Sequence, residues 1–182
     1  MKVLWLNGYA PDGTPKLRLV ADSAAVKHDR PVFAPDYAGG CRGVAAVAVR
    51  ISRLGLNISP RFAERYFSEY LPVLLILPES CADVYGTNGL YLAADNTFVT
   101  GDSLEAAQVQ GSVELSSGAA SVTVDCAPQV MARAIAAISR HTTLKLGDIV
   151  VYGSECLPLP VAPGENVKLS LQGEELVRAR IK

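Results

Sequence analysis

The stretch from residue 142 to residue 182 constrains the fold most strongly, because it is the most regularly patterned part of the chain. Its β-branched run at 149–151 is typical of a strand that is buried on both faces. A proline-rich turn follows, and then apolar residues alternate with polar ones over 167–171, which predicts a half-buried strand. A tight reversal at 172–174 and a second run at 176–181 predict a closing hairpin. The chain is therefore expected to end in β-structure.

Two helices are predicted between the strands. Ser59 followed by Pro60 is a capping signal, and it predicts a helix over about 60–70. Its buried face is expected to carry the aromatic residues Phe62, Tyr66 and Tyr70. Asp125 is the predicted N-cap of a second helix over 126–141. Strands are expected at 2–6, 16–20, 44–51, 71–77, 112–115 and 121–124. These elements together predict an α+β fold that is mixed but mostly β.

Composition excludes several classes of protein. The length of 182 residues favours one domain spanning 1–182, and the net charge of −1 gives no electrostatic case for nucleic acid or a membrane surface. No run approaches the roughly 18 apolar residues that a membrane span needs. The N-terminus lacks the pattern of a signal peptide, so we expect a cytoplasmic protein. The four cysteines show no CxxC pair and are expected to be reduced: Cys41, Cys81, Cys126 and Cys156.

Two segments carry a resemblance to a known family. The first is Thr143–Ile149, followed by Tyr152-Gly153-Ser154-Glu155, and the second is Ile51–Phe67, with its Arg-Leu-Gly turn and Phe-Ala-x-x-Tyr run. Both are similar to segments of the fumarylacetoacetate hydrolase family, of the 2-keto-4-pentenoate hydratase-like type. The resemblance implies a rolled, barrel-like sheet with few helices, and a homodimer.

The same resemblance implies that the family's metal site has been lost. Active members hold Mg²⁺ or Mn²⁺ with three acidic ligands, two of them in a Glu-x-Glu pair on one strand. Alignment places that pair at Val44 and Ala46 and the third ligand at Leu75. The family's lysine falls within 90–95, by a looser alignment, where Leu90 and Leu92 occupy the candidate positions, and no histidine follows Tyr9, where the family carries an acid/base pair. We therefore expect no metal cofactor, and no catalytic residue is assigned.

What remains is expected to be a vestigial pocket, formed by Tyr9, Val44, Ala46, Leu75, Leu90, Gly153, Ser154 and Glu155. Glu155 stands where the family has proline, and it is either a ligand contact or a solvated loop residue. Ser154 keeps the hydroxyl group of the family's threonine. This group either makes a retained contact with a ligand or forms a hydrogen bond that stabilises a turn. Spacing gives no support to a nucleophilic pair of Cys156 with either histidine, His28 or His141.

Three functional hypotheses follow. The first is a non-catalytic relative that acts through a binding surface or as a subunit. The second is a hydrolase or hydratase that acts on a small keto acid with relocated chemistry, through Ser154, Glu155 or an aspartate of the 79–102 loop. The third is a small-molecule binding protein that uses the vacated pocket.

Overall fold

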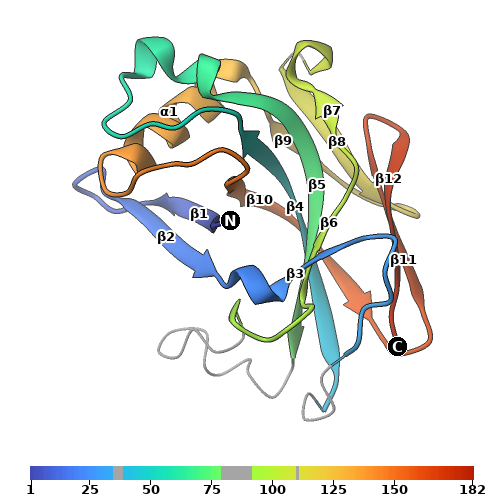
Figure 1. Ribbon diagram of the computed structural model, residues 1–182. Helices are drawn as coiled ribbons and strands as arrows, with labels where there is room; N and C mark the ends of the chain where they lie inside the picture. Colours follow the sequence, from blue (N-terminus) through green and yellow to red (C-terminus); the bar gives the residue numbers. More distant parts are fainter. Residues whose placement is uncertain (35–38, 79–91, 110) are drawn as a thin grey trace.

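A curled sheet of eight strands forms the body of the protein in the computed structural model, which describes residues 1–34, 39–78, 92–109 and 111–182 (Figure 1). Its strands are β1 (Val3–Tyr9), β2 (Pro15–Val20), β3 (Ala25–Lys27), β4 (Cys41–Ile51), β5 (Phe67–Pro78), β6 (Phe98–Thr100), β7 (Leu104–Glu105) and β10 (Ile149–Val161). The order across the sheet is β2-β1-β10-β4-β5-β6-β3, and β7 pairs with β5. Short 3₁₀ helices lie at η1 (Asp22–Ala24) and η6 (Ala106–Gln108).

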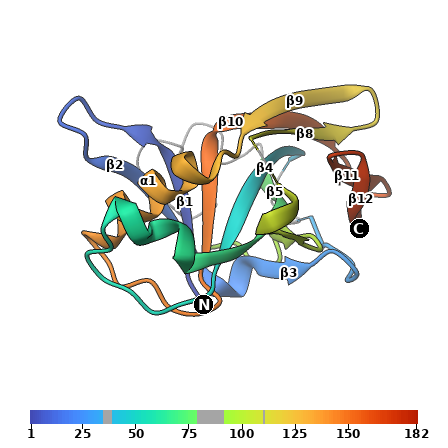
Figure 2. The ribbon, with the colours of Figure 1, turned by 90° about the horizontal axis from the view of Figure 1, so that it is seen from above.

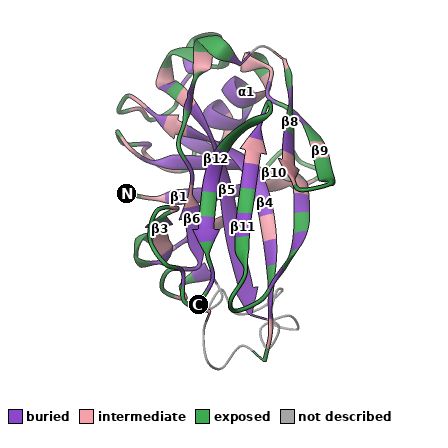
Figure 3. Ribbon diagram, turned by 90° about the vertical axis from the view of Figure 1, so that its right-hand side faces the viewer, coloured by how far each residue is buried: buried purple, intermediate pink, exposed green. Residues whose placement is uncertain are grey.

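A second, four-stranded sheet packs against the first. It consists of β8 (Ser112–Ser117), β9 (Ala120–Asp125), β11 (Asn166–Leu171) and β12 (Glu174–Arg180), in the order β12-β11-β8-β9. Buried residues alternate with more exposed ones along β11 and over 177–180 of β12 (Figure 3), as expected for a sheet with one face on the core and one in water. The predicted closing hairpin and the hairpin at 112–124 are confirmed.

The predicted second helix is confirmed as α1 (Pro128–Ser139), which lies beside β2 and β10 at one end of the large sheet (Figure 2). Met131, Ile135 and Ile138 are fully buried on its inner face. Its N-cap is Ala127, not Asp125 as predicted. The Asp125 carboxylate instead accepts a hydrogen bond at 3.0 Å from the N–H of Ala127, one step before the helix begins. No helix in the described part of the chain is long and apolar enough to cross a membrane.

The first predicted helix is shorter than expected and is not an α-helix. A 3₁₀ helix, η3 (Pro60–Tyr66), ends where β5 begins at Phe67. Tyr70 therefore lies in a strand, fully buried, and its hydroxyl group donates a hydrogen bond to the Cys126 carbonyl oxygen at 2.7 Å. Phe62 is 44% exposed. The prediction of one aromatic helix face was wrong, because the pairing of β5 with β4 outweighs the local helical spacing.

The predicted proline-rich turn after Ser154 is instead a continuation of β10, which runs to Val161 through Pro158 and Pro160. The reason lies in the pairing of this strand. Residues 149–152 pair with β1 on one side and β4 on the other, but 157–161 pair with β4 only. A proline lacks the N–H that a second neighbour would need, so it is tolerated where one side of the strand is open.

The large sheet separates two apolar clusters. One face packs against α1 and the small sheet, with Leu4, Val47, Leu74, Ile135 and Leu169 among its buried residues. The opposite face carries a second cluster, which includes Val3, Trp5, Ala46, Leu75 and Phe98. This second face holds the cavity described next.

Candidate functional site

A cavity of about 460 Å³ opens on the second face of the large sheet, and its apolar wall comes from neighbouring strands. Val44 of β4 and Leu75 of β5 are direct cross-strand partners and both line the cavity. Leu77, two residues along β5, projects from the same face, and Leu92 completes the wall. Ala46 is two residues from Val44 and fully buried in the same apolar cluster as Leu75. The three positions aligned with acidic ligands thus share one face of the sheet.

The polar side of the cavity comes from β1, β2 and β10. Trp5 and Asn7 lie two residues apart on β1, and Arg18 of β2 is the cross-strand partner of Trp5. Gly153 and Cys156 lie in the part of β10 where the register with β4 shifts, between Tyr152 and Leu157. The Cys156 thiol donates a hydrogen bond to the Gly153 carbonyl oxygen at 3.0 Å. Donor groups therefore gather opposite the aliphatic wall.

Gly153 permits a close approach that no other residue would allow. A Cβ atom at this position would lie 1.9 Å from Trp5 Nε1 and 2.8 Å from Asn7 Oδ1. The indole and the amide therefore occupy the space that a side chain at 153 would take. Packing around Trp5 thus explains the glycine at position 153.

We expect Gly153→Ala to destabilise the protein by about 1–3 kcal/mol, because the added methyl group displaces a packed indole. Urea unfolding measures the loss, and the emission of Trp5 reports the displaced ring. In a Trp5→Ala background the same substitution should cost much less, since the clash is gone. Equal losses in both backgrounds would show that the indole is not what excludes a side chain at 153.

The described residues do not suit a hard divalent cation. Mg²⁺ and Mn²⁺ prefer carboxylate, carbonyl and water oxygens. The described residues that line the cavity include no aspartate or glutamate. Over the described ranges, no group of three or more histidine, cysteine, aspartate or glutamate side chains lies close enough to hold a metal ion.

The other predicted pocket residues are placed as follows. Tyr9 ends β1 beyond a register shift, is 42% exposed, and is not among the described residues that line the cavity. Its pKa is raised by partial burial and by Tyr152, and Arg133 of α1 opposes the shift. Leu90 lies outside the described residues. Ser154 and Glu155 lie within β10, and their side chains are outside the described part of the structure.

Sequence reasoning missed Trp5, Asn7, Arg18 and Leu77. A signal was present for Trp5, which is the single tryptophan of the chain and lies in the strand predicted at 2–6. Asn7 lies beyond the end predicted for that strand; it shares a face with Trp5 because β1 continues to Tyr9. No local sequence signal distinguishes Arg18 as a cavity residue, since it is one of three basic residues within 16–27. Only the pairing of β1 with β2 brings it beside Trp5.

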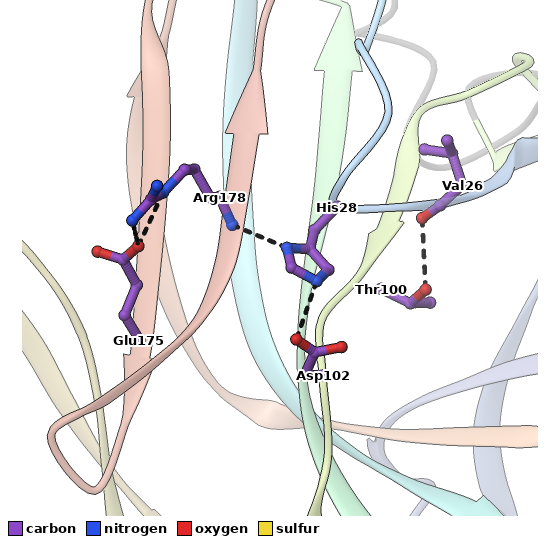
Figure 4. Close-up of polar contacts among 6 residues, drawn as sticks. All are labelled: Val26, His28, Thr100, Asp102, Glu175 and Arg178. Carbon is purple, nitrogen blue, oxygen red and sulfur yellow. Dashed lines mark hydrogen bonds and ion pairs between the residues drawn. The ribbon is translucent and has the colours of Figure 1, made fainter.

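His28 belongs to a separate polar cluster that joins the two sheets (Figure 4). Its Nδ1 accepts a hydrogen bond at 3.2 Å from the Arg178 backbone N–H, and its Nε2 lies 3.2 Å from Asp102 Oδ2. Because Nδ1 acts as an acceptor, the proton of the neutral ring is assigned to Nε2, which donates to Asp102. Both ring nitrogens are engaged, so His28 has no nitrogen left to activate a thiol. The geometry gives it a structural role.

Glu175 lies in the cleft beside His28 and forms ion pairs with basic side chains of the small sheet. Glu175 accepts hydrogen bonds from the Arg178 guanidinium group and lies 3.1 Å from Lys168 Nζ. Arg178 first, and Lys168 second, hold the pKa of the Glu175 carboxyl group below its usual value. Glu175 is therefore paired within the protein with Arg178 and Lys168.

Comparison with known proteins identifies the fold. No family model and no curated protein matches the sequence. Among solved structures, a Yersinia pestis protein named as a member of the fumarylacetoacetate hydrolase family shares 20% identity at a TM-score of 0.80, covering 100% of this chain and 92% of that one. A 2-hydroxyhepta-2,4-diene-1,7-dioate isomerase from Mycobacterium marinum shares 18% identity at a TM-score of 0.81, with coverage of 99% and 73%.

A 5-carboxymethyl-2-hydroxymuconate delta-isomerase from Mycobacterium smegmatis is similar to the same extent, with 17% identity, a TM-score of 0.81, and coverage of 99% of this chain and 76% of that one. The predicted fold, a rolled and mostly β sheet of the fumarylacetoacetate hydrolase type, is confirmed. At these identities the similarity establishes the fold and leaves the activity to be argued from the site.

Proposed function

We propose that this protein is a divergent, metal-free relative of the fumarylacetoacetate hydrolase enzymes, and that it acts by binding rather than by catalysis. One observation carries the proposal. Val44 and Leu75, which align with two of the family's acidic ligands, face one cavity as neighbouring aliphatic side chains. Ala46, which aligns with the remaining ligand, is fully buried on the same face.

The free-energy cost of burying unpaired carboxylates explains why positions 44, 46 and 75 would change together. A cluster of buried carboxylates is stable only while a cation neutralises it, because burying unpaired charge is costly. Once the cation is gone, aliphatic side chains are the more stable occupants of the site. The combination of Val44, Ala46 and Leu75 is the composition that such a loss favours.

The alternative is a hydrolase or hydratase of a small keto acid with relocated catalytic groups. The names of the similar structures, which include isomerases of unsaturated dicarboxylates, favour keeping this candidate. It requires a carboxylate, which the described residues lining the cavity do not include, and it would place the chemistry on Ser154 or Glu155.

A metal titration separates the two candidates. We expect Mn²⁺ added to the purified protein to produce no saturable heat and no loss of the free Mn²⁺ electron paramagnetic resonance signal up to about 1 mM, since hard cations need oxygen ligands. One-to-one binding tighter than this would reject the proposal. Glu155→Gln would then show whether a relocated carboxylate holds the ion.

A further inference from the structure

Two loops meet at the end of the large sheet where α1 lies, and a short backbone pairing joins them (Figures 1 and 2). Residues 52–59 connect β4 to η3, and residues 140–148 connect α1 to β10. Gly55 and Leu144 exchange two backbone hydrogen bonds, at 2.9 and 2.8 Å. The N–H of Gly147 donates at 2.8 Å to the last carbonyl group of β4. These paired loops therefore present one continuous surface.

The paired loops carry apolar side chains that the protein leaves in water. Leu54 is 68% exposed, Leu56 is 54% exposed and Leu146 is 75% exposed. A Cβ atom added to Gly55 would lie 2.6 Å from Tyr66, so position 55 faces the interior and the leucines on either side of it face outward. Grouped exposed apolar side chains mark a site that contacts another molecule or a membrane.

Positive charge surrounds these leucines. Segments 50–66 and 133–148 contain seven basic residues and two acidic ones, although the net charge of the chain is −1. Of the two acids, Glu64 is exposed, whereas Asp148 is buried and paired with Lys2. Six exposed basic residues of these segments form no ion pair within the described part of the chain: Arg53, Arg61, Arg65, Arg133, Arg140 and Lys145. The net charge therefore conceals a strongly positive end of the molecule.

The backbone pairing places basic residues directly beside the leucines. Across the antiparallel bridge between Gly55 and Leu144, the next residues on the two loops are Leu54 and Lys145, which are therefore neighbours. Arg53 precedes Leu54 in the chain. Apolar and positive side chains are thus interleaved on the paired loops.

The short helix η3 extends the same pattern. The guanidinium groups of Arg61 and Arg65 lie 5.6 and 5.3 Å from the centre of the exposed Phe62 ring. Such cation–π contacts keep an apolar ring between two positive charges. The first loop is tied to α1 through the Asn57 N–H, which donates to the Ser139 carbonyl oxygen at 2.9 Å. Loops and helices therefore hold the apolar and basic groups at one end of the molecule.

We propose that the paired loops and η3 bind the surface of a membrane that contains anionic lipid. Leu54, Leu56 and Leu146 enter the boundary between head groups and acyl chains, and the surrounding basic side chains stay among the anionic head groups. A fluid interface closes around protruding side chains, whereas a folded partner needs a matching hollow for each of them. The inference goes beyond the proposed function and does not depend on it, because these residues lie outside the cavity that Val44 and Leu75 line.

Co-sedimentation of the purified protein with lipid vesicles tests the inference. Phosphatidylcholine vesicles with about 30% phosphatidylglycerol are expected to bind the protein saturably at about 0.1 M salt. Vesicles of phosphatidylcholine alone should bind it at least about tenfold more weakly, because they offer no net negative charge. At about 0.5 M salt the binding to anionic vesicles should fall strongly, since screening shortens the reach of the charges.

Matched variants test the contribution of charge. Arg53→Ser combined with Lys145→Ser removes two positive charges beside Leu54 and should weaken binding to anionic vesicles at least about tenfold. Lys27→Ser combined with Lys168→Ser removes the same charge from exposed positions on β3 and β11, outside the paired loops. This control should bind within about twofold of the parent, because it leaves the charges next to the bilayer in place.

A second pair of variants tests the contribution of the apolar side chains. Leu146→Ser should weaken binding at least about fivefold, since it removes an apolar group that enters the bilayer. Phe33→Ser changes another exposed apolar side chain, outside the paired loops, and should leave the affinity unchanged. Thermal unfolding of each variant checks that it is folded, and the lipid and salt series on the parent protein does not depend on any variant.

Three results would overturn the inference: no binding up to about 1 mM lipid; equal binding to neutral and anionic vesicles; or full affinity when Arg53 and Lys145 are both replaced. A dimer that is lost in Leu146→Ser, without any vesicle binding, would instead assign the paired loops to a second copy of the chain. Failure here is separable from failure of the proposed function. Loss of vesicle binding leaves the metal-free role intact, whereas saturable Mn²⁺ binding rejects that role and leaves the membrane contact intact.

Discussion

The triple variant Val44→Glu, Ala46→Glu and Leu75→Asp is expected to lose at least about 5 kcal/mol of unfolding free energy in metal-free buffer at neutral pH. Ala46 is fully buried and Leu75 is 4% exposed, so carboxylates there would be removed from water. Val44 and Leu75 are cross-strand partners, so two of the new charges would also repel each other. Chemical denaturation at several pH values measures the loss.

A neutral variant separates charge from shape. Val44→Gln, Ala46→Gln and Leu75→Asn introduces side chains of similar size without charge, so the difference between the two variants reports the electrostatic part. Burial raises the pKa of a carboxyl group above its unfolded value, so the acidic variant should regain stability as the pH falls and the groups are protonated. An acidic variant as stable as the parent would show that these positions face water.

Asp148→Ala is expected to destabilise the protein by about 3–5 kcal/mol, because it removes the partner of three buried or half-buried donors. Asp148 is 1% exposed, and its two oxygens accept the backbone N–H groups of Lys2 at 2.7 Å and Lys145 at 2.9 Å. The Lys2 ammonium group lies 3.5 Å away. The carboxylate thus joins the beginning of β1 to the turn before β10.

Asp12→Ala is the matched control for this prediction. The Asp12 carboxylate also accepts a backbone N–H, that of Thr14 at 2.9 Å, but it lies in an exposed turn and joins residues only two apart. Urea midpoints should therefore fall strongly for Asp148→Ala and hardly change for Asp12→Ala. Similar shifts in the two variants would contradict the assigned role of the buried carboxylate.

Much of the fold could be predicted from local hydrophobic patterns in the sequence. The β-branched run at 149–151 is the first part of β10, and the alternation over 167–171 is β11. The helix predicted over 126–141 is α1, and its residues Met131, Ile135 and Ile138 recur at helical spacing on the buried face. The errors fell where distant pairing overrides local preference, as in the aromatic residues that became part of β5 and in the prolines of β10.

The candidate site could be predicted from the sequence only in part. Alignment to the family motifs identified Val44, Ala46 and Leu75 as candidate pocket residues. The structure places them on one face of the large sheet. Arg18 and Trp5 could not be joined from sequence, because their contact depends on the register between β1 and β2. Hydrophobic spacing predicts which residues of a strand share a face, but not which strand lies opposite.

The sequence by itself predicted most of the long strands, the helix α1 and the apolar residues at positions 44, 46 and 75, since each of these depends on residues close together in the chain or on identity at one position. The tertiary structure decided that β10 lies between β1 and β4, and hence that Gly153 meets Trp5 across more than 140 residues of chain. Strand order and register arise from the burial of many side chains at once, and no single segment contains that information. The cavity, with its donors on one side and aliphatic wall on the other, is a product of that arrangement.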